Sequence, residues 1–237
     1  YFISSSANGL YTAASKIPNF VILFSQIFID AWQLSAVDEY DQEGGRQFFT
    51  KVFRVYSGGI FAVASVLILL CQFITKILVA KSYYDSWQFV PILIIATTYS
   101  CVVNFLASIY MAEKKNVMSL VTAMSGAITN FVLNLVFIPR IGANGAALAT
   151  VCAFLVVFVT RAIDTRRFIK IDFKLPVLLG ETAVLVTQSI LLLKYDGTLW
   201  VYIIEVLLVV VMLLLNLKPI KELVNLILAK FLKKRKN

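Results

Sequence analysis

Residues 130–151 read NFVLNLVFIPRIGANGAALATV, two apolar runs joined by a short segment with one proline and two glycines. Asn130 and Asn134 lie four residues apart in the first run, so they share one face of a helix. Pro139 disfavours the helical conformation in the residue before it, and we expect the first helix to end there. The stretch predicts two helices that meet in a tight hairpin.

Small residues favour close packing within this hairpin. Gly142 and Gly145 permit a tight turn with positive φ. Gly126 continues the spacing of the two asparagines, and Ala146 opens an alanine-rich second helix. Small residues at such spacing let two helix backbones approach each other. We therefore interpret the proline, the two glycines of the turn and Ala146 as packing residues, whereas the asparagines remain open between interhelical bonding and a binding role.

The composition predicts a membrane protein. Hydrophobic residues make up 60% of the 237-residue chain, charged residues make up 15%, and the mean hydropathy is +0.85. Apolar usage in soluble domains is nearer half. The apolar residues fall in runs of about 20, the length at which a helix crosses the ~30 Å hydrocarbon core of a bilayer. We expect an all-α integral membrane protein.

Seven such runs are predicted to be transmembrane helices. Lipid requires each backbone group to be paired within its own segment, and long continuous runs fit helices better than the alternating strands of a barrel. Residues 1–16 are expected to form an external loop and the end of a preceding helix, and residues 47–56 a short connector helix. The predicted spans within 17–217 are 17–36, 57–79, 88–112, 117–138, 145–163, 176–193 and 199–217.

Basic residues predict the orientation. All but five of the 22 lysines and arginines fall in alternate connections and in the C-terminal segment. Such residues concentrate on the cytoplasmic side, so we expect a cytoplasmic C-terminus and an external start of this chain. The same rule explains the net charge of +9. In a soluble protein such a charge would suggest a nucleic-acid partner, which is not needed here. The five exceptions are Lys16, Lys76, Lys81, Arg140 and Lys194.

Residues 218–237 are predicted to form a cytoplasmic, amphipathic and basic tail. Apolar residues repeat at helical spacing from Ile220 to Leu232, and a basic cluster follows. Such a helix lies at the membrane surface and is attracted to anionic lipids. Two roles remain open for it, a positive anchor that sets topology and a regulatory element.

The residue types do not favour an enzyme. The chain has no histidine, which removes the commonest metal ligand and general base. Cys71, Cys101 and Cys152 all fall in predicted spans and are expected to be small apolar packing residues. The sequence contains no phosphate-binding glycine loop of the nucleotide-hydrolase type. We expect no catalytic site, no metal site and no cofactor.

Polar side chains at membrane depth need a partner or a cavity, so they are the candidate site residues. Gln26, Asp30 and Gln33 are spaced four and three apart and share one helical face. Asp30 is either a cavity-facing proton, cation or substrate site or an interfacial acid bonded to a neighbouring helix. Asn104, near the middle of its span, either lines a path or bonds another helix.

Two further acids lie in the last two predicted spans. Glu181 and Glu205 are each within one or two turns of a predicted span end, where water is in reach. We therefore expect both at the membrane interface and not in a buried relay.

Three ordered stretches resemble one transporter family. The hairpin pattern N-x3-N-x4-P-x2-G-x2-G-A-A begins at Asn130, NGLYTAASKIPN covers residues 8–19, and FIDAWQLSAVDEYDQ covers residues 28–42. Together they resemble the polysaccharide-exporter branch of the multidrug/oligosaccharidyl-lipid/polysaccharide flippase superfamily, whose members carry repeat units for O-antigen, capsule and exopolysaccharide. The resemblance covers nearly the whole chain.

The resemblance implies a fourteen-helix protein in two lobes, of which this chain forms most of the C-terminal lobe. The lobes would rock about a central cavity and move an undecaprenyl-pyrophosphate-linked oligosaccharide across the bacterial cytoplasmic membrane, coupled to a proton or sodium gradient. Implied partners are the missing N-terminal lobe, membrane lipids, and a polysaccharide polymerase or glycosyltransferases. The chain departs from the expected pattern in having few cations at membrane depth. The implied cavity residues are Lys16, Gln26, Asp30 and Gln33.

Other functions fit parts of the sequence. A multidrug exporter or a peptidoglycan-precursor flippase of the same superfamily would share the fold. A seven-helix receptor that binds retinal would need a lysine in its last span, and residues 199–217 contain none. A scaffold lobe that assembles with synthesis enzymes would copurify with glycosyltransferases without translocating a substrate.

Overall fold

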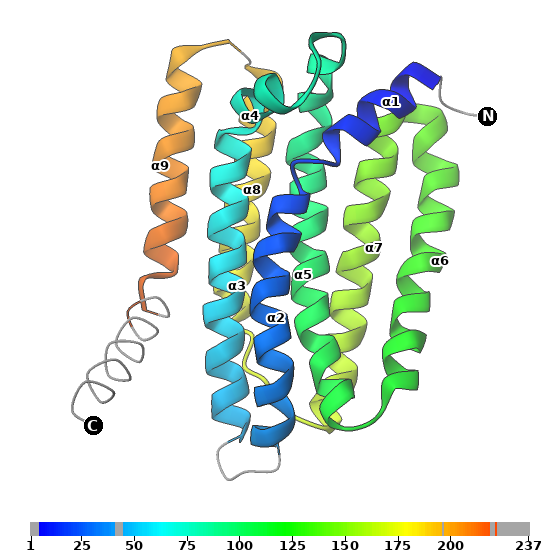
Figure 1. Ribbon diagram of the computed structural model, residues 1–237, viewed down its shortest axis with the longest axis vertical. Helices are drawn as coiled ribbons and strands as arrows, with labels where there is room; N and C mark the ends of the chain where they lie inside the picture. The colour runs from blue at the N-terminus through cyan, green and yellow to red at the C-terminus, as the bar shows by residue number, and fades with distance from the viewer. Residues whose placement is uncertain (1–4, 41–44, 196, 219–220, 222–237) are drawn as a thin grey trace.

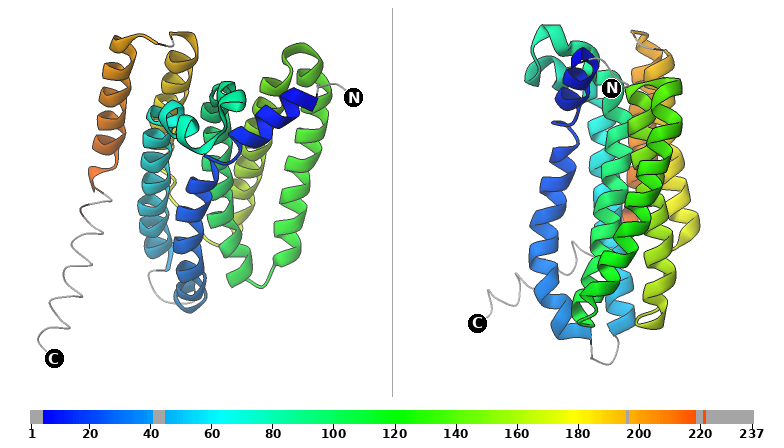
Figure 2. Two further views of the ribbon diagram at one scale, coloured as in Figure 1. Left: turned by 45° about the horizontal axis from the view of Figure 1, so that its top comes forward. Right: turned by 90° about the vertical axis from the view of Figure 1, so that its right-hand side faces the viewer.

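The computed structural model describes residues 5–40, 45–195, 197–218 and 221, and these form a bundle of helices (Figure 1). Long helices stand side by side, and the short α1 crosses one end of the bundle (Figure 2). In chain order the elements are α1 (Ser5–Ala14), α2 (Asn19–Tyr40), α3 (Gly45–Leu69), α4 (Cys71–Leu78), η1 (Lys81–Phe89), α5 (Val90–Ala112), α6 (Asn116–Ile141), α7 (Ala143–Asp164), η2 (Thr165–Arg167), α8 (Leu175–Lys194) and α9 (Leu199–Leu215).

Within the described residues, five helical segments are long and apolar enough to cross a membrane: Gly45–Leu69, Lys81–Ala112, Asn116–Ile141, Ala143–Arg167 and Leu175–Lys194. The apolar α9 is shorter, and α2 carries polar side chains in its middle. These five segments confirm the prediction of a helical chain with several helices long and apolar enough to cross a membrane. Among the described residues, each expected span overlaps a helix, but the expected span 57–79 is divided between α3 and α4, and the count of seven spans stays a prediction.

The core of the bundle lies around α5, which packs against α2, α3, α7 and α8. On α5, the Phe105 ring stacks on Trp32 from α2 with centroids 5.1 Å apart. Trp32 Nε1 donates a hydrogen bond of 2.8 Å to Ser108 Oγ. Tyr56 on α3 also stacks on Phe105, and its hydroxyl donates a hydrogen bond of 3.0 Å to the Cys101 carbonyl. These contacts fasten α2 and α3 to the central helix.

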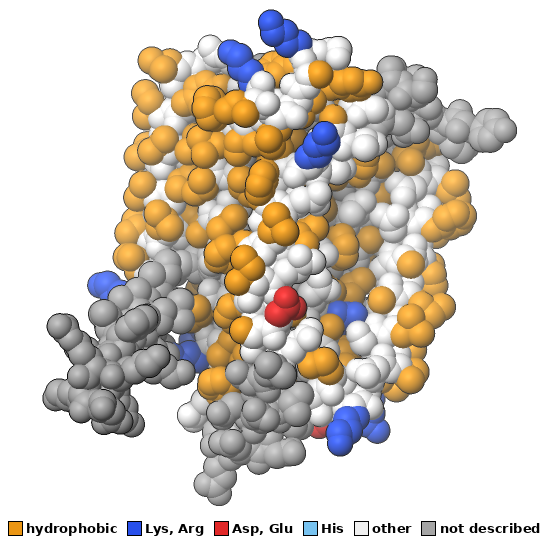
Figure 3. Space-filling view, viewed as in Figure 1, with side chains coloured by type: hydrophobic (Ala, Val, Ile, Leu, Met, Phe, Trp, Pro, Cys, Tyr) orange, Lys and Arg blue, Asp and Glu red, His pale blue; other side chains and the backbone are white. Residues whose placement is uncertain are grey.

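The outer surface of the bundle is strongly apolar, as the orange side chains in Figure 3 show. On α6 the exposed large side chains include Val117, Leu120, Ile128, Phe131 and Leu135. A contiguous apolar surface of this extent is unfavourable in water, whereas hydrocarbon neither penalises it nor competes for the helical hydrogen bonds beneath it. The surface therefore agrees with a membrane environment.

The hairpin of α6 and α7 is closely packed, but its first helix does not end as predicted. α6 continues through Pro139 to Ile141, so the prediction that Pro139 ends the helix is wrong. Proline removes only its own backbone donor, and the Gly142 amide donates to the Ile138 carbonyl at 2.9 Å, which completes the turn beyond it. Gly142 has the expected positive φ, +59°, and α7 follows directly.

Gly145 is required for close approach and not, as predicted, for a positive φ. A Cβ at Gly145 would lie 2.6 Å from the backbone carbonyl carbon and oxygen of Phe137 on α6. At Gly126, a Cβ would lie 2.2 Å from Val157 Cγ2 on α7. Both glycines let the two helices meet, Gly145 beside the turn and Gly126 farther along α6, and Ala146 is half-buried.

The connector predicted at residues 47–56 is not a separate helix. α3 runs from Gly45 to Leu69 without interruption, and the break comes at Leu70, before α4. The pair Gly58-Gly59 does not interrupt α3, because α9 packs there. A Cβ at Gly58 would lie 2.0 Å from Asn216 Oδ1, so this glycine makes room for a neighbouring helix end.

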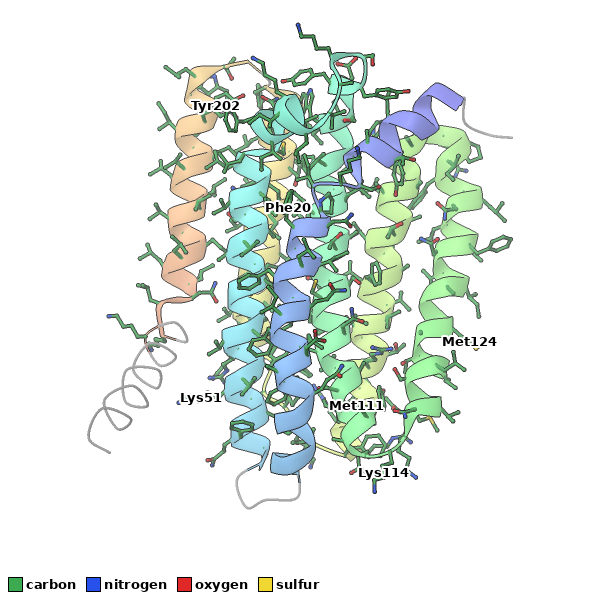
Figure 4. The ribbon with its side chains drawn as sticks, in the orientation of Figure 1. Phe20, Lys51, Met111, Lys114, Met124 and Tyr202 are labelled. Atoms are coloured by element: carbon green, nitrogen blue, oxygen red, sulfur yellow. The ribbon has the colours of Figure 1, made fainter. Side chains whose placement is uncertain are left out.

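We call the end of the bundle at which α2, α5 and α7 finish the basic end. Lys51 and Lys114 lie toward it in Figure 4, and Tyr202 lies toward the opposite end. The predicted amphipathic tail, residues 218–237, lies outside the described residues except for Lys218 and Lys221.

Candidate functional site

A cavity of about 390 Å³ opens between α5, α6 and α7. Most of its lining is small or apolar, including Gly126 and Ala153 at the contact between α6 and α7. The polar side chains that line it come from all three helices. They are Asn104 on α5, Asn130 on α6, and Thr150 and Arg161 on α7. We call this cavity the polar cleft.

Arg161 is only 4% exposed, and it joins the three helices around the polar cleft. Its Nε donates to Thr122 Oγ1 on α6 at 3.0 Å. Its Nη2 lies 3.1 Å from both the carbonyl and the hydroxyl oxygen of Ser119, also on α6. Its Nη1 donates to the Val103 carbonyl of α5 at 2.8 Å. The planar guanidinium, with five N–H donors, suits such bridging.

All of these acceptors are neutral. In the part of the chain that the structure describes, no carboxylate forms an ion pair with Arg161. The Tyr110 ring centroid lies 5.9 Å from Arg161 Cζ, and the Tyr110 hydroxyl donates to Asp164 Oδ2 at 2.8 Å. The carboxylate of Asp164 forms its ion pair with Arg167 and not with Arg161. A buried charge without a counter-charge is costly in apolar surroundings. The polar cleft therefore favours an anionic group.

The three candidate asparagines of α5 and α6 differ in how they are bonded. Asn104 is exposed and has no hydrogen-bond partner among the described residues. Asn130 Nδ2 lies 3.3 Å from Thr150 Oγ1 across the hairpin, and Asn134 Nδ2 donates to Asn130 Oδ1 at 2.8 Å. Asn134 Oδ1 has no partner there. The amide pair of α6 thus bonds α7, and Asn130 also lines the cleft, so both of its predicted roles stay open.

The candidates near the start of the chain lie outside the polar cleft. Lys16, in the turn before α2, is exposed, as are Gln26 and Asp30, while Gln33 is half-buried. None of the four lines the polar cleft. Figure 3 shows one small acidic spot in the lower middle of this face and a small basic spot to its right. The structure therefore does not bring these four candidates together with the residues of the polar cleft.

A second polar cluster lies between α3, α8 and α9, and we call it the buried seam. Ser65 Oγ donates to Gln188 Oε1 at 2.8 Å, and Gln188 Nε2 donates to Glu205 Oε2 at 2.8 Å. Glu205 is 0% exposed, and its Oε1 has no partner within the described part of the chain. Glu181 is also buried, so both acids are enclosed by protein, while their predicted placement at the membrane interface stays a prediction.

Sequence reasoning missed the burial of Arg161, because it assigned this residue to a basic connection. A signal was present in the spacing. Ala149, Ala153, Val157 and Arg161 repeat at four residues and are all buried on α7, so the arginine continues the face that packs against its neighbours. The expectation that few cations lie at membrane depth did not take Arg161 into account.

The polar cleft has the means to bind a ligand, since Arg161 contributes a positive charge and the Asn104 amide, which has no partner among the described residues, offers N–H donors to phosphate or hydroxyl oxygens. Among the described residues, no group of three or more Asp, Glu or Cys side chains could hold a metal ion. Comparison with protein-family models, with curated proteins and with solved structures found no match to this chain.

Proposed function

We propose that this chain forms one lobe of a flippase that moves lipid-linked oligosaccharide repeat units across the bacterial cytoplasmic membrane by alternating access. The observation that carries the proposal is the polar cleft, where Arg161 has no acidic partner and Asn104 has no hydrogen-bond partner among the described residues. A pyrophosphate needs cationic N–H donors, and sugar hydroxyls bond amides. The resemblance of three sequence motifs to polysaccharide exporters supports the same function.

The exposed face of α2 supports a second lobe opposite this one. Phe20, Leu23 and Ile27 are exposed there beside Gln26 and Asp30. In the proposed transporter, the N-terminal lobe would cover this face and enclose the polar side chains in a central cavity. Asp30 would then contact the substrate or bind the coupling ion.

The proposal includes a topology. All seven long helices would cross the membrane, the basic end would face the cytoplasm, and the C-terminal tail would lie on the cytoplasmic surface. Polysaccharide polymerase or glycosyltransferases would be neighbours in the membrane, since they make and use the transported unit.

Complementation tests this function. The full-length gene is expressed in a strain that lacks its own repeat-unit flippase, and surface polysaccharide and accumulated lipid-linked units are measured. We expect polymer to return and the lipid intermediate to fall. If neither changes in several hosts with different repeat units, although the protein reaches the membrane, the proposal fails. Drug-efflux and peptidoglycan-precursor assays then test the alternative exporters.

Point variants in the same assay test the polar cleft and the exposed face of α2. Because Asn104 has no hydrogen bond to lose among the described residues, we expect Asn104→Ala to reduce export severalfold at unchanged protein abundance. Asp30→Asn should reduce export or alter its dependence on pH or sodium. Asp85→Asn, an exposed acid on η1, is the matched control and should export normally. Normal export by both Asn104→Ala and Asp30→Asn would remove these residues from the site.

A further inference from the structure

A separate cavity of about 470 Å³ lies at the basic end, beside the first half of α3. Arg46, Thr50 and Arg54 line it from α3, at a spacing of four residues that places them on one helical face. Asp172, in the connection before α8, and Lys218, after α9, complete its charged lining together with Lys51 of α3 (Figure 4). We call it the basic pocket. It shares no residue with the polar cleft.

The connection before α8 is fastened to α3, which holds the basic pocket in shape. Arg46 Nε donates to the Lys170 carbonyl at 2.8 Å. The Asp172 amide donates to Thr50 Oγ1 at 3.2 Å. Arg54 Nη2 lies 2.8 Å from Asp172 Oδ2. Three contacts from successive turns of one helix thus set the position of the pocket wall.

The one carboxylate that lines this pocket in the described part of the chain is already engaged. Asp172 accepts from the Lys174 amide at 3.0 Å, and its other oxygen lies 3.5 Å from Lys174 Nζ and 2.8 Å from Arg54. The backbone N–H of Lys174, then the charges of Lys174 and Arg54, hold the pKa of Asp172 below its usual value. Asp172 therefore stays ionised and offsets one cation only.

Cationic donors remain for a ligand. Arg46 is bonded through Nε to a neutral carbonyl, which leaves its charge without a carboxylate in the described residues. Arg54 Nε is buried and has no hydrogen-bond partner there. Lys218 lines the same cavity. Two guanidinium groups, two ammonium groups and one carboxylate thus line a space the size of a small-molecule site.

The position of the basic pocket identifies the ligand. It lies where the apolar segments Gly45–Leu69 and Leu175–Lys194 both begin, so in a membrane it stands at the depth of the lipid headgroups. Guanidinium groups bind phosphate through paired N–H donors. We propose that the basic pocket binds the phosphate of an anionic membrane lipid in the leaflet at the basic end. This inference does not depend on the proposed transport function.

Lipid titration of the purified full-length protein in mild detergent tests the proposal. Binding is followed by native mass spectrometry and by thermal stabilisation, with phosphatidylglycerol, with phosphatidylcholine, and with inorganic phosphate. We expect phosphatidylglycerol to bind at least tenfold more tightly than phosphatidylcholine. The double variant Arg46→Gln, Lys218→Gln should lose about tenfold in affinity for phosphatidylglycerol, since it removes two charged donors and leaves the Arg54 ion pair intact.

The matched control is Lys115→Gln, Arg166→Gln, which removes two exposed charges at the basic end outside the pocket. It should bind phosphatidylglycerol as the unaltered protein does. Equal loss of binding in both double variants would overturn the site in favour of general surface charge, and so would unaltered binding in the pocket variant. Stabilisation by inorganic phosphate as strong as that by phosphatidylglycerol would overturn the lipid as its source. If the pocket double variant does not fold, Lys218→Gln alone decides between these outcomes.

Discussion

The buried seam and the polar cleft place the same kinds of side chain between apolar helices, with opposite results. In the buried seam, Gln188 accepts from Ser65 and donates to Glu205, and all three side chains are shut away from the surface. In the polar cleft, Asn104 is exposed without a partner and Arg161 has neutral acceptors only within the described residues. A polar residue inside a helix therefore does not by itself indicate a binding site.

The difference arises from how the helices pack. α3 contacts α8 and α9, which also contact each other, so three helices close around the buried seam. α6 packs extensively on α7 and only slightly on α5, which leaves the space that forms the polar cleft. In the closed cluster the polar side chains bond one another, whereas the open one leaves Asn104 available to a ligand or another helix.

The largest effect should come from separating α6 and α7. We expect Gly145→Ala to destabilise the protein by about 3 kcal/mol or more, because the new Cβ would meet the Phe137 backbone, which cannot rotate away. The polar cleft would lose its shape with the hairpin. Thermal unfolding and the yield of folded protein in detergent measure this.

The matched variant for that test is Gly180→Ala on α8, where a Cβ would lie at an ordinary 3.8 Å from Leu215 Cδ1. It should leave stability unchanged or raise it by up to about 1 kcal/mol, as alanine favours a helix over glycine. Similar stability of the two alanine variants would show that the hairpin does not depend on close backbone contact.

Removing the arginine of the polar cleft should have the next largest effect. Arg161→Leu deletes the hydrogen bonds that join α7 to α5 and α6, and we expect a loss of about 2–3 kcal/mol in the free energy of unfolding. Arg161→Lys keeps the positive charge but not the planar guanidinium with its several N–H donors, so it should lose part of the same free energy of unfolding. Arg166→Leu, at an exposed site nearby, is the control and should stay within about 0.5 kcal/mol of the unaltered protein. If Arg161→Leu were as stable as this control, the helices would not need the guanidinium.

The buried seam should distinguish a missing partner from a missing charge. Glu205→Ala removes the carboxylate acceptor of the buried Gln188 amide and leaves it only the longer contact of 3.4 Å with the Ser65 carbonyl, so we expect a loss of about 1–2 kcal/mol in stability. Glu205→Gln fills the same volume and can still accept that bond, so it should change stability by less than the alanine variant. Equal loss in both, seen by thermal unfolding, would mean that the carboxylate itself is needed and that the seam is more than packing.

The smallest effect should come from an exposed ion pair. Asp172→Asn weakens contacts with Arg54 and the Lys174 amide, and because the carboxylate is exposed we expect at most about 1 kcal/mol. The folded pKa lies below the ordinary value of 3.8, so the stabilisation is present above pH 3.8 and is lost as the pH falls through the folded pKa. The free energies of unfolding of the unaltered protein and of Asp172→Asn should therefore converge as the pH falls through the folded pKa. A difference that grew with acidity would contradict the assignment.

Several features could be read from the sequence. The apolar runs 88–112, 117–138, 145–163 and 176–193 predicted α5, α6, α7 and α8 to within a few residues, because a run of some twenty apolar residues has few alternatives to a helix in lipid. The repeat at four residues around Gly126 and Asn130 predicted the face on which α6 meets α7, since helical periodicity alone decides which residues share a face. The turn at Gly142 followed from glycine's freedom at positive φ.

Other features could not be read from it. Pro139 fits within the last turn of α6, and Glu205 lies in a closed cluster, although its sequence position near a helix end indicated water. Each outcome depends on a partner more than a dozen residues away, as with Glu205 and Gln188, or on the local geometry of one turn. Propensity and spacing carry no information about either.

By itself, the sequence determined that this chain forms apolar helices, which faces of α6 and α7 are small enough to touch, and that basic residues gather at one end, because composition and helical period act locally. Only the tertiary structure decided that Arg161 is buried at the polar cleft while Glu205 is enclosed in the buried seam. The physical reason is that burial and hydrogen-bond partners are properties of several helices together. The same polar side chain becomes part of the core where three helices close and part of a site where they leave a gap.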